Sequence, residues 1–489
     1  DNSLRGRILG RNRLFLSPNT ELMAESGYIS DRNFLEQYFE REWDTEKDFT
    51  SGVRLRRYNG SRMFDLSANV RVNDFFTETE SLPRLDHYWL GQDLFDERFT
   101  FSAVSSVGYL HQRPAEPPTD PQELAKYAVQ PWESDSEGLV ASTRQELSYP
   151  LALGAFNVIP YVSGEAAFYN EDVNQNDETR LTGQAGLRTA LPFWRAYPNV
   201  ENRLFDLRGI AHKVTLESDF FYADSNKDLS LFPLYDPLDD TAQEQFRRRL
   251  VYNTFGGTLP PQFDERNFAF RNRMQGWLTA GNRQVADDLT QARFGINQRW
   301  QTKRGLAGRE RIVDLVSFDT DFIFYPQAER DNFGASFGAI NYDFRYHVGD
   351  RLTLLSDGYL DVFSEGLKSA SVGAQISRPG RGDVYIGMLS LEGPISANVL
   401  SGYTNYRLND KWILSGGAVV DFGKTGSSGQ NIALTRIGET ALVRVGVNVD
   451  TGRDNVSFNF NIEPRFLPTV RLGALGGQLI PPVGLFGLE

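Results

Sequence analysis

The sequence predicts an all-β fold, and within that class a large transmembrane antiparallel β-barrel of roughly 20 to 26 strands. Apolar and polar residues alternate along residues 455–466 (NVSFNFNIEPRF), and the same pattern recurs along the chain. A strand projects successive side chains to opposite faces, so each such segment has one apolar and one polar face. Aromatic residues make up 13% of the chain, with 35 Phe and 20 Tyr, which suits the aromatic belts of a barrel. The 44 glycines suit strand bends and tight turns.

Strands are expected along the whole chain, without a linker that would divide its 489 residues into several domains. We expect residues 1–467 to form the barrel and the apolar, Gly- and Pro-rich residues 468–489 to form an extended C-terminal tail. The predicted strands are residues 7–16, 21–29, 34–43, 49–58, 64–72, 99–110, 139–149, 156–169, 179–191, 213–223, 292–302, 313–325, 337–348, 351–363, 369–377, 383–391, 395–407, 412–422, 441–450 and 455–466.

The connections between these strands are predicted to be short at one end of the sheet and long at the other. Tight turns rich in Asn, Asp and Gly are predicted at residues 58–61, 348–350, 408–410 and 450–453. Long polar loops are predicted at residues 113–138, 170–178, 225–280 and 423–434, and we expect them outside the cell. Residues 120–123 and 239–250 carry the capping and charge patterns of short helices, although an irregular loop fits them equally well.

Composition excludes several classes of function. A net charge of -13 argues against a nucleic-acid binder, which needs clustered Lys and Arg. The absence of cysteine excludes disulfides and thiolate metal sites. A mean hydropathy of -0.42 fits a water-soluble protein and a barrel alike, because only every second residue of a barrel strand faces lipid. The first residues lack the apolar core of a signal peptide, so either a leader was removed or a longer precursor precedes them.

The sequence contains no convincing catalytic constellation, so we expect no enzymatic activity and no cofactor. Its four histidines, His87, His111, His212 and His347, are isolated from one another in the sequence. His347 lies on the polar face of its predicted strand.

Two further motifs have plain structural explanations. The Arg381-Gly382-Asp383 tripeptide follows Pro-Gly and predicts a hairpin turn rather than an adhesion motif. Two acidic groups offer oxygen ligands for a divalent cation, although solvated loops are the better interpretation. They are Asp236 with Asp239 and Asp240, and residues 133–137 (ESDSE).

Several stretches together resemble the LptD family of lipopolysaccharide-assembly outer-membrane proteins, also called organic-solvent-tolerance proteins. They are residues 26–39 (SGYISDRNFLEQYF), 81–90 (SLPRLDHYWL), 212–240, 272–300, 412–422 and 441–465. Residues 81–90 resemble a short element between two barrel strands of that family, and the last two stretches resemble its closing strands. The order and spacing of these pieces carry more of the resemblance than any single motif.

Three departures from the family pattern accompany this resemblance. Type members of the family have disulfides that link a periplasmic domain to the barrel, whereas this chain has no cysteine. Their last hairpin carries Cys-Cys-Trp, where this chain has residues 450–455 (DTGRDN). The family's N-terminal jellyroll is not present in this chain, and the first barrel strands are expected to precede Asp1 as well.

The resemblance implies an outer-membrane translocon that inserts lipopolysaccharide, or a related lipid, into the outer leaflet through a barrel lumen and a lateral gate. It implies a plug lipoprotein and periplasmic bridge proteins as partners, with outer-membrane lipids around the barrel. The candidate gate residues lie on the last strand and are Asn455, Ser457, Asn459, Asn461 and Pro464. Pro464 cannot donate a ladder hydrogen bond, which places it at a weak pairing or simply at the end of the strand.

Three other functions remain open at the level of sequence. A generic porin or substrate-specific outer-membrane channel would share the barrel but lack a weak seam. A barrel lipid hydrolase would need a Ser and a His close together on one wall. A soluble secreted β-protein would bury the apolar faces of its strands.

Overall fold

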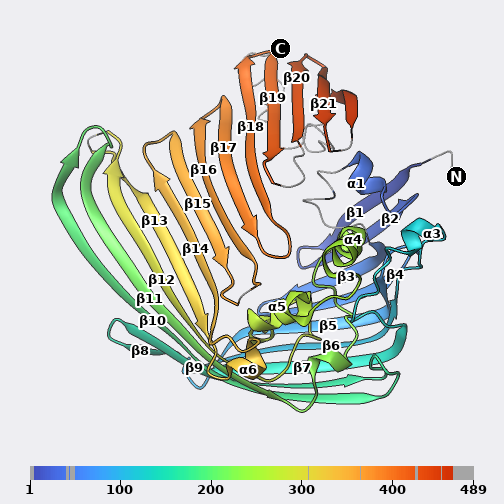
Figure 1. The fold of residues 1–489 in the computed structure, drawn as a ribbon. Coiled ribbons are helices and arrows are strands. Elements are labelled where there is room, and N and C mark those ends of the chain that lie inside the picture. Colours follow the sequence, from blue (N-terminus) through green and yellow to red (C-terminus); the bar gives the residue numbers. More distant parts are fainter. Residues whose placement is uncertain are drawn as a thin grey trace. The chain divides into compact units, whose positions relative to one another are not determined.

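The computed structural model describes residues 5–39, 43, 50–306, 308–363, 365–423, 428–452 and 454–465. Its strands belong to one antiparallel sheet of 22 strands (Figure 1). The predicted all-β fold is therefore confirmed, and the strand number lies inside the predicted range. The C-terminal tail, residues 468–489, lies outside the described residues.

The strands follow one another along the chain with few interruptions. They are β1 (Arg7–Ser17), β2 (Thr20–Ile29), β3 (Ser51–Asn59), β4 (Arg62–Val70), β5 (Glu78–Leu94), β6 (Phe99–Arg113), β7 (Ser136–Ser148), β8 (Leu151–Leu153), β9 (Phe156–Tyr169), β10 (Glu178–Asn202), β11 (Leu207–Ser225), β12 (Leu289–Arg304), β13 (Arg311–Phe324), β14 (Phe337–His347), β15 (Leu352–Leu360), β16 (Lys368–Arg378), β17 (Gly382–Glu392), β18 (Ala397–Asn409), β19 (Trp412–Asp421), β20 (Ser428–Ile437), β21 (Ala441–Asp450) and β22 (Asn455–Pro464). The α-helices are α1 (Phe34–Tyr38), α3 (Pro121–Leu124), α4 (Glu244–Phe255), α5 (Glu265–Arg271) and α6 (Ala328–Asp331).

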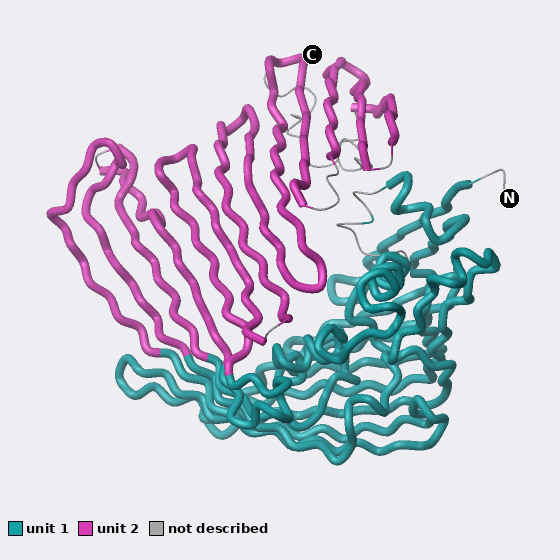
Figure 2. Tube along the Cα trace, in the orientation of Figure 1, with its two compact units in different colours: residues 1–190, 218–293, 324–336 teal, residues 191–217, 294–323, 337–489 magenta. Residues whose placement is uncertain are grey.

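The chain forms two compact units, which Figure 2 shows in different colours. The first comprises residues 1–190, 218–293 and 324–336, and the second comprises residues 191–217, 294–323 and 337–489. Strands β10 to β13 contribute residues to both units. Within each unit, strands that follow one another in sequence pair antiparallel, from β1 to β7 in the first and from β14 to β22 in the second. The small strand β8 pairs with β9, which itself pairs with β7 and β10.

Connection lengths alternate along this meander, as the sequence predicts. In the first unit, short turns at residues 60–61 and 95–98 alternate with longer connections at residues 71–77 and 114–135. The turn at residues 450–453 is an exception, because it joins β21 to β22 at the end of the sheet that carries the longer connections. The predicted loop at residues 423–434 is too long, since β20 already begins at Ser428. The first four residues of β20 are Ser, Gly, Gln and Asn, so its apolar residues begin only at Ile432.

Two other predicted elements are wrong. Residues 34–43, predicted as a strand, begin with the helix α1, and Phe34 packs in a buried cluster with Ile29 and Phe76. The apolar residues Phe34, Leu35 and Tyr38 have helical spacing, which is the signal that separates the two structures. Residues 81–90 do not lie between strands but inside β5, where the pairing with β6 shifts between Ser81 and Arg84. That irregularity places Pro83, which has no N–H to donate, where the ladder is already interrupted.

Both predicted loop helices are present. The Asp120 side chain accepts hydrogen bonds from the backbone N–H groups of Gln122 (2.8 Å) and Glu123 (3.1 Å), so it caps α3. Within residues 239–250, a 3-10 turn at Thr241–Gln243 leads into α4, which begins at Glu244 and ends before Gly256, whose φ of 70° suits a helix C-terminus. Among the described residues, no helix has both the length and the apolar character needed to cross a membrane.

Candidate functional site

A row of apolar side chains, five of them exposed and three half-buried, crosses eight strands of the first unit. The register of strands β1 to β9 aligns Leu14, Leu22, Leu55, Leu66, Leu85, Val107, Ala141 and Phe168. Leu14 is 54% exposed and Leu66 is 44% exposed. We call these eight residues the apolar row. Because paired residues point to the same side of a sheet, the apolar row belongs to a single face.

Strands β21 and β22 of the second unit have an equally apolar face. Val445 pairs with Phe460 and Val447 pairs with Phe458. Phe458 is 79% exposed and Phe460 is 68% exposed. A soluble β-protein buries such a face against another layer, so these exposed rings contradict the soluble interpretation.

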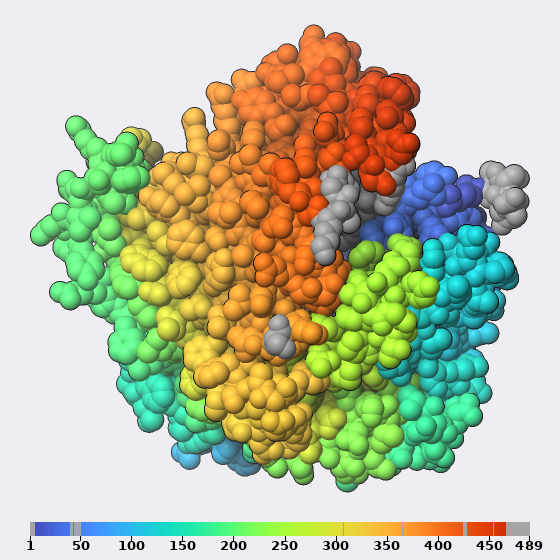
Figure 3. All heavy atoms as spheres, viewed as in Figure 1, coloured from blue at the N-terminus to red at the C-terminus, as the bar shows by residue number. Residues whose placement is uncertain are grey.

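The opposite face of the first unit is covered by the connection between β11 and β12, residues 226–288. Figure 1 shows α4 and α5, which belong to this connection, lying over strands β3 to β7. In the space-filling view, the yellow-green segment with α4 packs against the cyan loop between β6 and β7 (Figure 3). We call residues 226–288 the covering segment and the face beneath it the covered face.

Buried ion pairs attach the covering segment to β7, β9 and β10. Glu165 of β9 bonds both Arg144 of β7 and Arg180 of β10, and the Arg180 side chain is fully buried. Arg144 Nη1 donates to the Gln275 carbonyl oxygen at 2.6 Å, and Arg180 Nη1 donates to the Gln284 carbonyl oxygen at 2.7 Å. Each guanidinium therefore joins a strand carboxylate to the backbone of the covering segment. Charged hydrogen bonds of this kind are strong and geometrically specific.

A second set of ion pairs joins β5 to the covering segment. Arg84 of β5 forms ion pairs with Asp86 of the same strand and with Asp236 of the covering segment. Arg283 of the covering segment forms an ion pair with Asp86, with its Nη2 atom 3.0 Å from Asp86 Oδ1. The four charges alternate in sign along the series Asp236, Arg84, Asp86 and Arg283, so none of them is buried without an opposite charge beside it.

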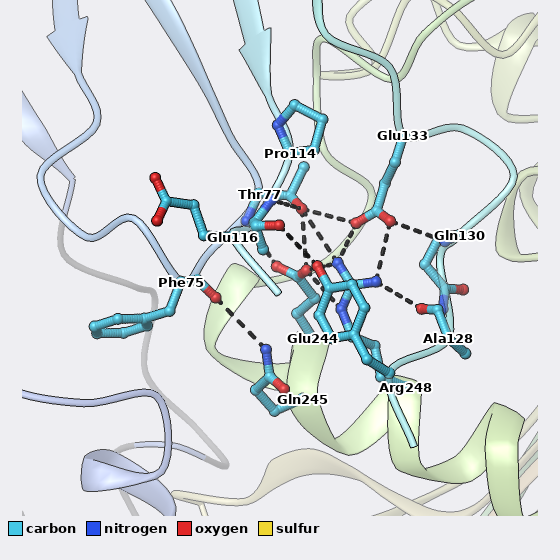
Figure 4. A network of polar contacts seen from close by, with 12 residues as sticks. Phe75, Thr77, Pro114, Glu116, Ala128, Gln130, Glu133, Glu244, Gln245 and Arg248 are labelled. Carbon is cyan, nitrogen blue, oxygen red and sulfur yellow. Dashed lines mark hydrogen bonds and ion pairs between the residues drawn. The ribbon is translucent and has the colours of Figure 1, made fainter. Parts of the chain in front are cut away.

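The helix α4 is held by a third cluster, which Figure 4 shows from close by. Arg248 lies between two carboxylates, Glu133 of the loop before β7 and Glu244 of its own helix. Its Nη1 atom also donates to the Ala128 carbonyl oxygen at 2.6 Å. Thr77, just before β5, donates its hydroxyl to Glu133 at 2.8 Å and its backbone N–H to Glu244 at 2.8 Å.

The pKa values of these loop groups reflect burial and charge together. For Asp236, burial opposes ionisation, but the ion pair with Arg84 outweighs it and lowers the carboxyl pKa. For Glu244, burial outweighs the attraction of Arg248, and with the neighbouring Glu133 it raises the pKa. Burial also raises the pKa of Tyr127, beside Arg248, to about 12.

The two acidic groups considered as cation sites are solvated loops only in part. The side chains of Asp135, Glu137 and Asp239 are exposed, as a solvated loop predicts, whereas one carboxylate of each group is buried in an ion pair. Asp236 forms an ion pair with Arg84, and Glu133 forms one with Arg248. The sequence did not reveal these partners because they lie more than 100 residues away. Within the described ranges, no group of three or more His, Asp or Glu side chains is arranged to hold a metal ion.

The candidate gate residues follow the alternation predicted for β22. Asn461, Asn459 and Ser457 pair with Arg444, Gly446 and Asn448 of β21, on the face opposite the exposed phenylalanines. Asn455 pairs with Asp450 next to the turn. Pro464 pairs with Ala441 and is the last residue of the strand, as its lack of an N–H predicts.

The four histidines lie on four different strands. His111 Nε2 is 2.8 Å from Asp135 Oδ1, and His347 Nδ1 is 3.0 Å from the hydroxyl of Thr353. His212 stacks on Trp300, and His87 stacks on Phe64. None of these contacts brings a serine hydroxyl to an imidazole. The Arg381–Asp383 tripeptide lies in the hairpin between β16 and β17, as predicted.

No protein-family model matches the chain, and no curated protein matches it. Solved structures similar to it include a mutant of the Rh. blastica porin, at 10% identity over 68% of this chain and 92% of that one, with a TM-score of 0.27. P. aeruginosa FpvA bound to heterologous pyoverdines matches at 8% identity over 85% of this chain and 62% of its own, with a TM-score of 0.28. The KdgM porin matches at 10% identity over 36% and 89%, with a TM-score of 0.17. At these scores the likenesses assign no activity to this chain.

Proposed function

We propose that this protein is an outer-membrane β-barrel that moves an amphipathic lipid through a polar interior. The observation that carries the proposal is the division between the two faces of its strands. The apolar row lies exposed on one face, while the other carries the ion pairs of Arg144, Glu165 and Arg180. Lipid accepts the first face and excludes the second.

The outer membrane is the location that this architecture fits. Strands that cross a bilayer must satisfy every backbone hydrogen bond within the sheet, which requires that the sheet close into a barrel. Each spanning strand then alternates between lipid-facing and interior residues, and successive strands are joined by short turns at one end and longer loops at the other. The described strands have both properties.

Lipopolysaccharide, or a related lipid, is the proposed cargo. This choice rests on the resemblance of residues 26–39, 81–90, 212–240, 272–300, 412–422 and 441–465 to the LptD family. In this proposal the saccharide passes through the polar interior and the acyl chains leave sideways along β22. No bond is made or broken. A plug lipoprotein and periplasmic bridge proteins supply and orient the lipid.

A channel for small solutes is the second candidate, and the covering segment favours it. Residues 226–288 hold many of their contacts with the covered face through buried charges, so they would narrow a barrel interior permanently. A fixed constriction selects small solutes by size and charge. The two candidates differ in what they carry and in whether the wall must open.

Depletion of the protein in its native host separates these candidates. The lipid proposal expects newly made lipopolysaccharide to accumulate inside the cell and to disappear from the surface, as measured by surface labelling.

Cysteine cross-linking then tests the lateral route. Each variant carries one cysteine in β22, at Ser457, Asn459 or Asn461, and one from a panel of cysteines through β1. A cross-linked pair that leaves the protein folded should stop export, and reduction should restore it. Unchanged export in fully cross-linked protein would refute the lateral gate, and loss of solute uptake alone would favour the channel.

A further inference from the structure

The polar face of the second unit carries a row of uncharged side chains. The register of strands β16 to β21 aligns Gln375, Tyr385, Tyr403, Gly417, Asn431 and Asn448 across six neighbouring strands. We call these six residues the neutral row. It lies on the face opposite the exposed residues of the same strands, such as Ile386 and Val445. A row without a charge is unusual on a face that elsewhere carries ion pairs.

Two tyrosines form an aromatic platform within the neutral row. The rings of Tyr385 and Tyr403 stack with centroids 4.9 Å apart and planes 25° apart. The Tyr385 ring lies against the sheet over Gly373 and Gly387, because a Cβ atom on Gly373 would lie 2.8 Å from that ring and one on Gly387 would overlap its hydroxyl. Tyr403 rests on this supported ring and is itself 54% exposed.

The space beside Tyr403 is bounded by a glycine and an amide. Tyr403 pairs with Gly417, and Gly417 pairs with Asn431. A Cβ atom on Gly417 would meet Asn431 Oδ1 at 3.4 Å and Tyr403 Cβ at 3.6 Å, which are ordinary contact distances. A small side chain therefore fits at Gly417 without moving the backbone, and a larger one would fill the space next to the ring.

These features match the chemistry of a sugar ring. A pyranose has an apolar C–H face that packs on an aromatic ring through dispersion, and a rim of hydroxyls that both donate and accept hydrogen bonds. The amides of Gln375, Asn431 and Asn448 offer both kinds of partner, and Asp383 with Asn405 in the next row adds acceptors. An anionic ligand would need a positive counter-charge that the neutral row lacks, and an acyl chain would leave the amides unsatisfied.

We propose that the neutral row is a binding site for an uncharged saccharide chain, with one sugar ring stacked on Tyr403. This site rests on the proposed function for the source of the sugar, because a lipid-linked saccharide would cross this face during transport. A free oligosaccharide offers the same rings and hydroxyls, so the experiment includes both sources.

The test is calorimetric titration of the purified full chain in detergent micelles with maltohexaose and, separately, with lipopolysaccharide. Tyr403→Ala removes the platform and should weaken binding about tenfold, whereas Tyr403→Phe keeps the ring and should bind almost as wild type does. Gly417→Val fills the space beside the ring and should weaken binding similarly. Tyr406→Ala is the matched control, because Tyr406 lies on the same strand but on the opposite face. Heat-modifiable gel mobility confirms that each variant is folded.

Each outcome decides the proposal. Binding of maltohexaose that is weakened by Tyr403→Ala and Gly417→Val supports recognition of the sugar itself. Binding of lipopolysaccharide alone, with the same sensitivity, supports a lipid-linked saccharide. No binding of either probe, or equal binding by wild type and both variants, overturns the site. If the site binds saccharide but depletion leaves lipopolysaccharide export unchanged, the proposed transport function fails while the site stands.

Discussion

An arginine placed on the exposed face of β21 should impair insertion or stability. Val445 is 53% exposed and lies near the middle of the β21–β22 pair, opposite Phe460. If this face contacts lipid, Val445→Arg places a guanidinium near mid-membrane and should reduce the free energy of unfolding by about 2–4 kcal/mol. Val449→Arg, at the end of the same strand, should cost only about 0–1 kcal/mol, as expected near an interface.

The control for this prediction lies on the same strand. Asn448 faces the opposite side, so Asn448→Arg should change stability by less than about 0.5 kcal/mol. Urea-dependent unfolding from lipid vesicles measures all three variants. Equal tolerance of arginine at Val445 and Asn448 would refute the assignment of the two faces, because an exposed site in water accepts either substitution.

Three further predictions follow from the covered face and the histidines. Glu165→Gln leaves Arg144 and Arg180 without their shared carboxylate and should reduce the free energy of unfolding by about 3–5 kcal/mol. Arg11→Gln is the control, because Arg11 belongs to a half-exposed ion pair whose loss should cost under about 1 kcal/mol. Similar losses in the two variants would contradict the burial of the cluster. The pKa of Asp236 is lowered in the folded state, so its contribution to folding stability is complete above its ordinary pKa of 3.8 and is lost as pH falls through the folded value. Asp236→Asn should therefore make the free energy of unfolding less dependent on pH in the acid range. An unchanged acid profile would exclude this ion pair. The purified protein should not hydrolyse phospholipids or esters, and turnover that disappears when one histidine is changed to alanine would replace transport with hydrolysis.

The two-faced strands could be predicted from sequence because alternation is a local signal. The alternation of apolar and polar residues along β22 was visible in residues 455–466 alone. The helix α1 lies within a predicted strand, although Phe34, Leu35 and Tyr38 have the spacing of one helix face. Strand β20 was partly hidden because its first four residues are Ser, Gly, Gln and Asn, which carry no apolar alternation.

The ion pairs of the covered face could not be predicted, since they depend on how distant segments meet. Arg144 and Gln275 are 131 residues apart, and nothing local to either residue identifies the other. The apolar row and the neutral row depend on register in the same way. Each strand contributes one residue, and only the alignment of neighbouring strands brings those residues into a line.

A membrane-spanning barrel requires that the apolar face of its strands meet lipid, and site-directed spin labelling measures that exposure. The chain has no cysteine, so Leu66→Cys, Val445→Cys, Asn431→Cys and Asn448→Cys each give a single labelling site. In proteoliposomes, nitroxides at Leu66 and Val445 should be accessible to oxygen and protected from a water-soluble nickel chelate. Nitroxides at Asn431 and Asn448 should show the reverse preference. Access of the nickel chelate to all four positions would contradict a lipid-facing apolar row and with it the membrane-spanning barrel.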